Sequence, residues 1–271
     1  MFINKFIVKK MQKMRNKKGQ LTLWIIVAII IVAAIVLLFA FRIPQRFILP
    51  SSPTVQLQDC IKSELTNALS LVEKRGGSIN PMNSMMYNGE KVEYLCYINE
   101  YYKTCSNQQP LLKQHIEREI LDAIKGKAQT CIDNLKSDLE ARGYTVTERK
   151  QDISVSIEPN NIVVVFSGID IKKESTSESY AKLEAKQASE IYDLIMLTTS
   201  ILNWEARYGD SEITAYMSYY PGIKVEKYKQ SDGSKIYILS SRNTDDKFVF
   251  ATRSLSWPAG YGIGETYKPV T

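Results

Sequence analysis

The sequence has little of what enzymes need: it contains one histidine, His115, and no glycine-rich loop placed between a strand and a helix. A catalytic triad or dyad would have to use His115 as its base, and its neighbours Gln114 and Glu117 indicate a solvated helix face instead. The glycines between Gly260 and Gly264 superficially resemble a phosphate-binding loop but lack the strand-to-helix context. We therefore expect no catalytic residue, no metal site and no cofactor.

Acidic residues are absent from the first 19 positions, which hold seven basic ones. The formal net charge of the whole chain is +6, so removing these seven leaves −1 from Gln20 onward. A basic arm is typical of contact with nucleic acid or with a membrane, and the segment that follows decides between them. The basic residues are Lys5, Lys9, Lys10, Lys13, Arg15, Lys17 and Lys18.

Charged residues are also absent from Leu21 to Phe41, where Thr22 is the polar exception. A helix of this length spans about 30 Å, the thickness of the hydrocarbon core of a bilayer. A core helix of a soluble protein is the competing interpretation, but such a helix would carry a polar face. We therefore predict a transmembrane helix over 21–41 that contacts membrane lipid, and we expect no binding of nucleic acid by the arm.

The basic flank sets the orientation of this helix. Lysine and arginine accumulate on the cytoplasmic side of a membrane span, so residues 1–20 are predicted to be cytoplasmic and the bulk of the chain to be extracellular. A cleaved secretory signal peptide is an alternative. The apolar run is longer than the usual core of such a peptide, and Pro44 and Pro50 follow it in place of a small-residue cleavage site.

The junction Lys17-Lys18-Gly19-Gln20-Leu21-Thr22 resembles the archaeal class III signal peptide of type IV pilins and archaellins. In that family a prepilin-type peptidase cleaves after the glycine, and the apolar segment is kept as a membrane anchor or as the core helix of a fibre. The resemblance implies cleavage between Gly19 and Gln20. Trp24 stands where the family often has glutamate, and prolines after the span interrupt any continuing helix, which favours an anchored protein over a filament subunit.

The outer part of the chain is similar to archaeal surface proteins that share this N-terminus. The similarity rests on Cys60-Ile61-Lys62 in a helix ending at Gly76-Gly77, on Thr130-Cys131-Ile132 and on Phe248-Val249-Phe250-Ala251. It implies a location at the cell surface and no particular activity.

The remaining pattern predicts an α+β fold, in which the transmembrane helix precedes an extracytoplasmic domain of about three helices packed on an antiparallel β-sheet. A Pro/Ser linker occupies 42–53, the domain 54–256 and a flexible tail 257–271. Apolar residues at helical spacing predict helices from Thr54 to Gly76, from Pro110 to Gly143 and from Thr176 to Arg207. Strands are predicted over 91–103, 152–157, 162–171, 212–220, 223–229, 235–240 and 246–252, with a hairpin turn at Asp232-Gly233.

Four cysteines, Cys60, Cys96, Cys105 and Cys131, all follow the apolar segment. An even number of cysteines outside the cytoplasm favours disulfides, and we predict the pairs Cys96–Cys105 and Cys60–Cys131. The first pair would close a hairpin, and the second would join the first two helices of the domain. Four buried thiols remain an alternative, as does a zinc site, against which the absence of any Cys-x-x-Cys pair argues.

Tyrosine is abundant, with sixteen residues in the chain. Tyrosine offers a large rigid contact area with a polar tip and is favoured at interfaces, so the clusters predict a binding face for an envelope protein or a glycan. The alternative is that these side chains cover the edge of the core and the outer face of the sheet. The two clusters are Tyr94, Tyr97, Tyr101 and Tyr102, and Tyr216, Tyr219 and Tyr220.

Three functions are compatible with these features. The first is a membrane-anchored cell-surface protein with a binding or structural role in the envelope. The second is a pilin-like filament subunit that assembles through its apolar helix. The third is an extracytoplasmic enzyme of unknown type, which the single histidine and the lack of a nucleophile motif disfavour.

The anchor interpretation makes a prediction for the mature N-terminus. Mass spectrometry of the membrane-bound protein is expected to show either the intact chain or a chain that starts at Gln20, because both keep the apolar segment. A chain that starts after Phe41 would instead identify a secreted protein and would contradict the anchor.

Overall fold

The structure is a computed structural model that describes residues 26–33, 35–36, 52–149 and 152–256. The chain divides into two compact units, Met1–Ser51 and Ser52–Thr271. Each unit is described by itself below.

The first unit contributes a helical segment within 26–36, and all of its described residues are exposed. Within the described ranges, no helix combines the length and the apolar composition that are needed to cross a bilayer. Residues 21–25, 34 and 37–41 of the expected span lie outside these ranges, as do Gly19, Gln20 and most of the linker. The tail 257–271 also lies outside them. The transmembrane helix, the cleavage site and the tail therefore stay predictions.

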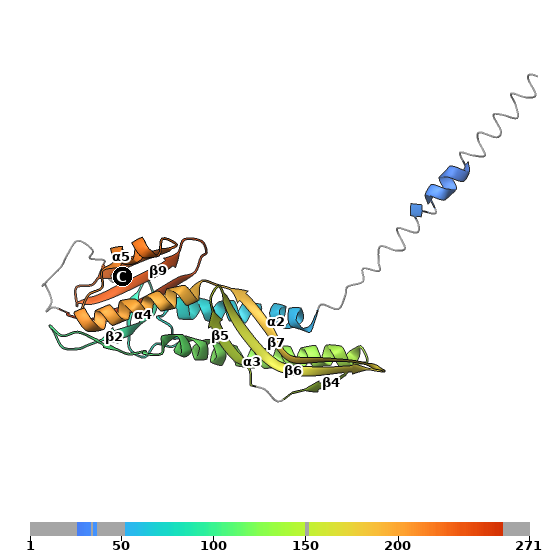
Figure 1. Cartoon of the computed structure of the whole chain (residues 1–271), viewed down its shortest axis with the longest axis horizontal. Helices are drawn as coiled ribbons and strands as arrows, with labels where there is room; N and C mark the ends of the chain where they lie inside the picture. The colour runs from blue at the N-terminus through green and yellow to red at the C-terminus, as the bar shows by residue number, and fades with distance from the viewer. Residues whose placement is uncertain (1–25, 34, 37–51, 150–151, 257–271) are drawn as a thin grey trace, which may run out of the picture. The chain divides into compact units, whose positions relative to one another are not determined.

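The second unit is an α+β fold, as the sequence predicts, with four helices in its described residues (Figure 1). The first, α2, begins at Pro53 and not at Thr54, because the side chain of Ser52 accepts a hydrogen bond from the Val55 amide (3.4 Å) and proline suits the first helical turn. The helices are α2 (Pro53–Lys74), α3 (Leu112–Ala141), α4 (Ile191–Tyr208) and α5 (Ile213–Tyr219).

The strands form two sheets and not one. The larger has the order β1-β2-β10-β9-β8, with β3 also paired to β2, and it is antiparallel except between β2 and β10. Its strands are β1 (Ser84–Tyr87), β2 (Glu90–Tyr97), β3 (Ser106–Asn107), β8 (Ile223–Lys229), β9 (Ser234–Ser241) and β10 (Lys247–Arg253). The smaller sheet is antiparallel around β6, which pairs with β7 on one edge and with β4 and β5 on the other. It contains β4 (Thr145–Glu148), β5 (Ser154–Glu158), β6 (Asn161–Lys173) and β7 (Thr176–Ala188).

Helix α3 forms as its apolar stripe predicts. The stripe residues recur every three or four positions, and all of them are buried. Gly143 adopts a positive φ of 82° just after the helix, a conformation that glycine tolerates better than other residues. The stripe consists of Leu112, Ile116, Ile120, Ile124, Ala128, Cys131, Leu135 and Leu139.

The prediction of one long helix from Thr176 to Arg207 is wrong for the first half of that range. Residues 176–188 form strand β7, which pairs along its length with β6, and the helix begins only at Ile191. Lys182, Glu184 and Lys186, at a spacing of two, form ion pairs along the strand. Pairing with the apolar strand β6 therefore overrides the helical preference of a segment rich in lysine, glutamate and alanine.

The strand expected over 212–220 is also wrong, because most of this segment forms helix α5. The carboxylate of Glu212 accepts a hydrogen bond from the Thr214 amide at 2.9 Å and so caps the helix. Ile213, Tyr216 and Met217, at the i, i+3 and i+4 spacing of a helix, pack against the core. The three later strands and the turn at Asp232-Gly233 are confirmed.

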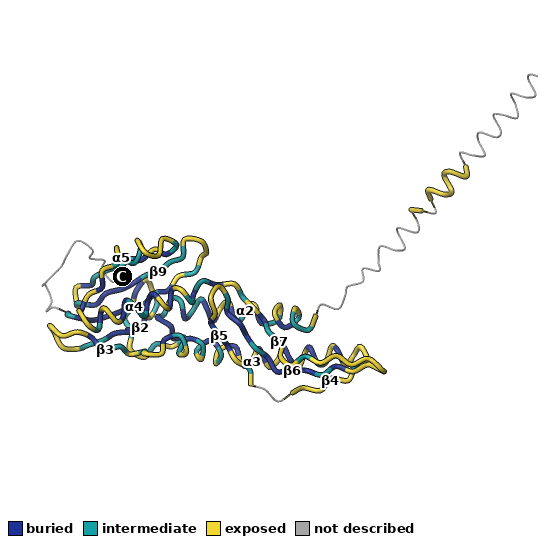
Figure 2. Tube along the Cα trace, in the orientation of Figure 1, coloured by how far each residue is buried: buried dark blue, intermediate teal, exposed yellow. Residues whose placement is uncertain are grey.

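The core joins both sheets through the helices. Helix α2 packs against α3 and also contacts β7 of one sheet and β10 of the other, and the deepest residues follow these elements (Figure 2). Both predicted disulfides are present: Cys60–Cys131 links α2 to α3, and Cys96–Cys105 closes the segment between β2 and β3.

The two disulfides are expected to contribute unequally to stability. In the chain-entropy model, replacing both Cys60 and Cys131 with alanine lowers the free energy of unfolding by about 4 kcal/mol, because the bond closes a long loop. The matched variant, Cys96→Ala with Cys105→Ala, opens a loop with a sequence separation of 9 instead of 71 and is expected to lose about 2 to 3 kcal/mol. Equilibrium unfolding in urea measures both. A smaller loss for the first pair than for the second would contradict the entropic explanation.

Candidate functional site

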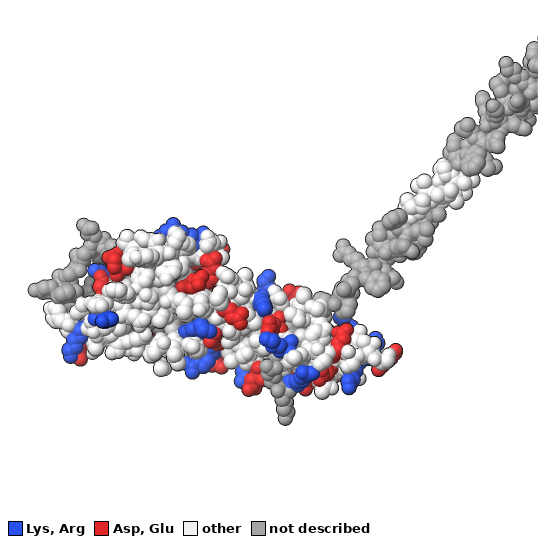
Figure 3. Space-filling model, in the orientation of Figure 1, with Lys and Arg blue, Asp and Glu red and all other residues white. Residues whose placement is uncertain are grey.

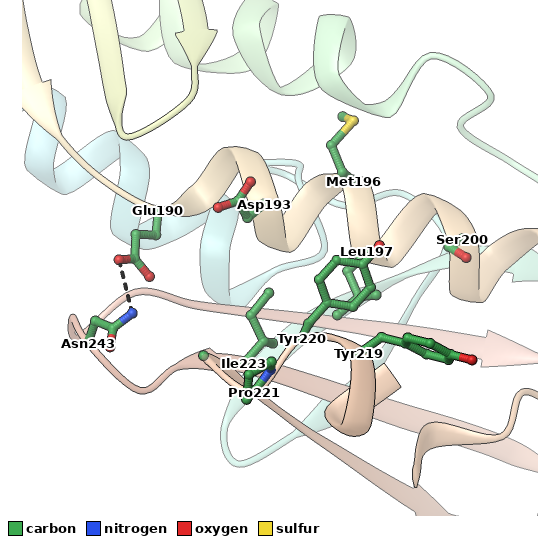
Figure 4. A pocket seen from close by; sticks show the side chains of 11 residues that line it. Glu190, Asp193, Met196, Leu197, Ser200, Tyr219, Tyr220, Pro221, Ile223 and Asn243 are labelled. Atoms are coloured by element: carbon green, nitrogen blue, oxygen red, sulfur yellow. Dashed lines mark hydrogen bonds between the residues drawn. The ribbon is translucent and has the colours of Figure 1, made fainter. Parts of the chain in front are cut away.

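A groove of about 530 Å³ lies between α4 and the segment that joins α5 to β8 (Figure 4). This volume is within the usual range of a binding pocket. We call it the α4–α5 groove. It is lined by Glu190, Asp193, Met196, Leu197, Ser200, Tyr219, Tyr220, Pro221, Gly222, Ile223 and Asn243.

The aromatic side of the groove comes from the end of α5. Tyr219 is 81% exposed and Tyr220 is 53% exposed. The hydroxyls of Tyr216 and Ser200 lie 3.0 Å apart, so α5 is fastened to α4 just behind the exposed pair. This hydrogen bond, between two partly buried side chains, links the helix that ends at Tyr219 to α4.

The other end of the groove is acidic. The Glu190 carboxylate accepts hydrogen bonds from the hydroxyl of Ser241 (2.5 Å) and the side-chain amide of Asn243 (3.5 Å), the latter drawn in Figure 4. Asp193, one turn further along α4, is exposed and has no side-chain partner among the described residues. No lysine or arginine lines the groove as the structure describes it. The lining therefore carries two carboxylates and no compensating cation.

A third carboxyl group lies behind this acidic end. Burial, reinforced by repulsion from Asp246, raises the pKa of Glu73 to about 8, although Lys74 and Lys247 oppose the shift. Asp246 in turn accepts a hydrogen bond from the backbone amide of Glu190 (2.5 Å). Glu73 is therefore mostly protonated at neutral pH.

Helix α4 is a firm support for the groove because a buried network holds its C-terminal end. Glu205 is fully buried, pairs with the ammonium group of Lys235 (2.7 Å) and accepts a hydrogen bond from the Tyr237 hydroxyl. Lys235 also donates to the carbonyl oxygen of Gly209 (2.6 Å). Removing one partner of such a pair leaves a buried charge uncompensated, so the network fixes α4 against β9.

The outer face of α4 extends the apolar surface of the groove. Met196, Trp204 and Tyr208 are 39%, 49% and 50% exposed, and their spacing places them on one side of the helix. The rings of Trp204 and Tyr208 lie 4.7 Å apart between centroids. Exposed apolar side chains that gather on adjoining elements mark interaction sites.

The other tyrosine cluster is placed differently. The hydroxyl of Tyr94 lies 2.8 Å from that of Ser234, and the ring of Tyr94 packs on Tyr97. The guanidinium of Arg253 lies over the rings of Tyr97 and Tyr101, at 6.0 and 5.4 Å from their centroids. Tyr101 and Tyr102, in the segment closed by Cys96–Cys105, are about half exposed. The two predicted clusters thus lie on different elements, and Tyr219 and Tyr220 are the members that line a groove.

Sequence reasoning did not find the remaining lining residues. Glu190 falls within the predicted long helix from Thr176 to Arg207, whereas it precedes α4 and accepts hydrogen bonds from Ser241 at the end of β9 and from Asn243 in the β9–β10 connection. Asp193, Met196 and Asn243 carried no recognised motif. The signal that could have found them is the pair of acidic residues at the start of α4, Glu190 and Asp193, because a helix N-terminus favours negative charge.

His115 is not the solvated residue that its neighbours suggested. Its Nε2 lies 2.8 Å from the hydroxyl of Ser78, and the same hydroxyl contacts the carboxylate of Glu93. Burial lowers the pKa of His115 and raises that of Glu93. In a catalytic triad the imidazole stands between hydroxyl and carboxylate, whereas here the hydroxyl stands between the other two and is only 5% exposed. The cluster joins α3 and β2 to the segment after α2.

Among the described residues, no group of three or more histidine, cysteine, aspartate or glutamate side chains is placed to hold a metal ion. Comparison with protein-family models, with curated proteins and with solved structures finds no match to this chain. The groove is therefore interpreted from its own chemistry.

The raised pKa of Glu73 predicts a pH dependence of stability. Between the pKa of 4.5 for an ordinary glutamate and that of about 8 in the folded protein, the folded state holds a proton that the unfolded state has lost. The free energy of unfolding therefore falls as the pH rises through this window, by a few kcal/mol at most at about 1.4 kcal/mol per pKa unit.

Glu73→Gln is expected to flatten this slope and to be more stable than the parent protein above pH 8. Glu64→Gln, on the same helix, is the control and is expected to keep the parent slope. Urea unfolding at pH values from 5 to 9 measures the effect, and equal slopes for Glu73→Gln and the parent protein would contradict the assignment.

Proposed function

We propose that this chain is a membrane-anchored cell-surface protein whose outer unit binds a partner through the α4–α5 groove. The observation that carries the proposal is the groove itself, with exposed aromatic side chains on a rigid support. Tyrosine, tryptophan and methionine are enriched at interfaces, and all three types are exposed on α4 or at the end of α5. An apolar pocket with a few polar groups is the default site of ligand binding.

The two disulfides support an extracellular location for the outer unit. Disulfides persist in oxidising compartments and are rare in the cytosol. The basic arm and the apolar run supply the proposed anchor, with the arm on the cytoplasmic side. The class III leader resemblance adds a proposed cleavage between Gly19 and Gln20 by a prepilin-type peptidase.

Assembly into a filament is the second candidate, favoured by one observation. The described part of the N-terminal helix exposes apolar side chains such as Ile26, Ile30 and Val36, which suit contact with other helices as well as with lipid. Sheared filaments prepared from cells would contain the protein if this candidate is right. Recovery only with membranes would support the anchored protein.

The partner-binding role is tested by crosslinking in intact cells. A photoreactive phenylalanine analogue in place of Tyr219 is expected to capture a specific envelope component, because this side chain projects from the groove. The same analogue at Tyr101 is the matched control, since that tyrosine is also exposed but lies on the other cluster. Capture from Tyr101 and not from Tyr219 would overturn the choice of groove, and capture from neither would overturn the binding role.

A further inference from the structure

We propose that the α4–α5 groove receives a basic segment of a partner protein. One lysine or arginine side chain of that segment pairs with Asp193 at the acidic end, and another lies over Tyr219 or Tyr220 at the aromatic end. This inference rests on the proposed function and specifies the chemistry of the partner.

The charge of the lining selects the sign of the ligand. Glu190 and Asp193 both line the groove, and no cationic side chain among the described residues lines it with them. A ligand that covers the groove removes water from these carboxylates, which is costly unless the ligand supplies compensating charge. An anionic ligand would add repulsion to this cost. A cation instead forms charge-assisted hydrogen bonds, which are stronger than neutral ones.

The aromatic end of the groove suits the same ligand. Arginine and lysine bind over the faces of tyrosine rings by cation–π attraction, and arginine also stacks on them. Tyr219 has most of its surface open for such contact, and its neighbour Tyr220 lies beside Leu197 and Pro221 in the groove (Figure 4). The groove thus offers an aromatic surface and carboxylates within one hollow.

The extent of the exposed surface favours a protein over a small cation. A row of exposed aromatic side chains, Trp204 and Tyr208, lies on α4 beyond the lining of the groove. Tryptophan and tyrosine are the residues that most often carry the binding energy of protein interfaces. A single amine would fill the hollow and leave this row uncovered, whereas a peptide segment can cover both.

A neutral glycan fits the groove less well. The acidic end offers chiefly carboxylate acceptors, and the side-chain amide of Asn243 already donates to Glu190. A sugar hydroxyl both donates and accepts hydrogen bonds, and a neutral glycan brings no charge to compensate the two carboxylates. The acids also have a structural role, since negative charge near the start of α4 stabilises that helix. The experiment below therefore measures stability as well as binding.

The test uses the full chain in lipid nanodiscs and four fluorescent probes. Three are capped peptides of equal length that carry arginine, glutamine or glutamate at the same positions, and the fourth is a neutral oligosaccharide. The arginine peptide is expected to bind best, with an affinity that falls as salt is added. Asp193→Asn is expected to weaken its binding at least about tenfold, the cost of losing a hydrogen bond to a charged group.

Asp138→Asn is the matched control, because this aspartate is exposed on α3 outside the groove and its loss removes the same charge. Replacing Tyr219 and Tyr220 with alanine is expected to weaken binding of the arginine peptide, and Tyr101→Ala to leave it unchanged. Thermal unfolding of each variant separates lost binding from lost folding. Equal loss with Asp138→Asn and Asp193→Asn would show non-specific attraction and would overturn the inference.

The outcomes also separate this inference from the proposed function. Binding of the oligosaccharide or the glutamine peptide through Tyr219 and Tyr220 would overturn the basic partner while leaving the groove as a binding site. Binding of no probe would likewise overturn the basic partner, and the crosslinking experiment at Tyr219 would then decide the binding role by itself.

Discussion

The packing of α2 against α3, linked by the Cys60–Cys131 disulfide, is the contact on which the second unit depends. Helix α2 contacts β7 of the smaller sheet and β10 of the larger one, and α3 contacts β4 and β5. The two sheets do not pack against separate sets of helices. Because α2 and α4 each contact strands of both sheets, the main core cluster contains residues from both of them.

Helix α4 connects this core to the proposed binding surface. Its inner face is buried through residues such as Leu194, Ile195 and Ile201, and Glu205 ties its end to Lys235 and Tyr237. Its outer face stays open with Met196, Trp204 and Tyr208. A binding surface on a packed helix loses little conformational entropy when a partner arrives, which is the physical advantage of building it there.

The carboxylates on the two sides of α4 differ in whether a cation compensates them. The buried carboxylate of Glu205 forms an ion pair with Lys235, whereas Asp193 at the groove has no side-chain partner among the described residues. Over the visible face of the outer unit, acidic and basic side chains are otherwise interspersed (Figure 3). A mixed surface avoids long-range attraction to one kind of partner, so selectivity has to come from local features such as the groove.

The sequence by itself determined whatever depends on neighbours along the chain: the buried stripe of α3, the alternation of β5 and the turn at Asp232-Gly233. The basic arm and the apolar run within residues 1–41 are also read directly along the chain, and they predict a membrane anchor without reference to tertiary structure. Tertiary structure decided the rest. Residues 176–188 became a strand only because β6 lies beside them, and α5 became a helix because its apolar residues meet the core. The groove brings together Asp193, Tyr219 and Asn243, whose proximity arises from packing and not from any spacing along the chain.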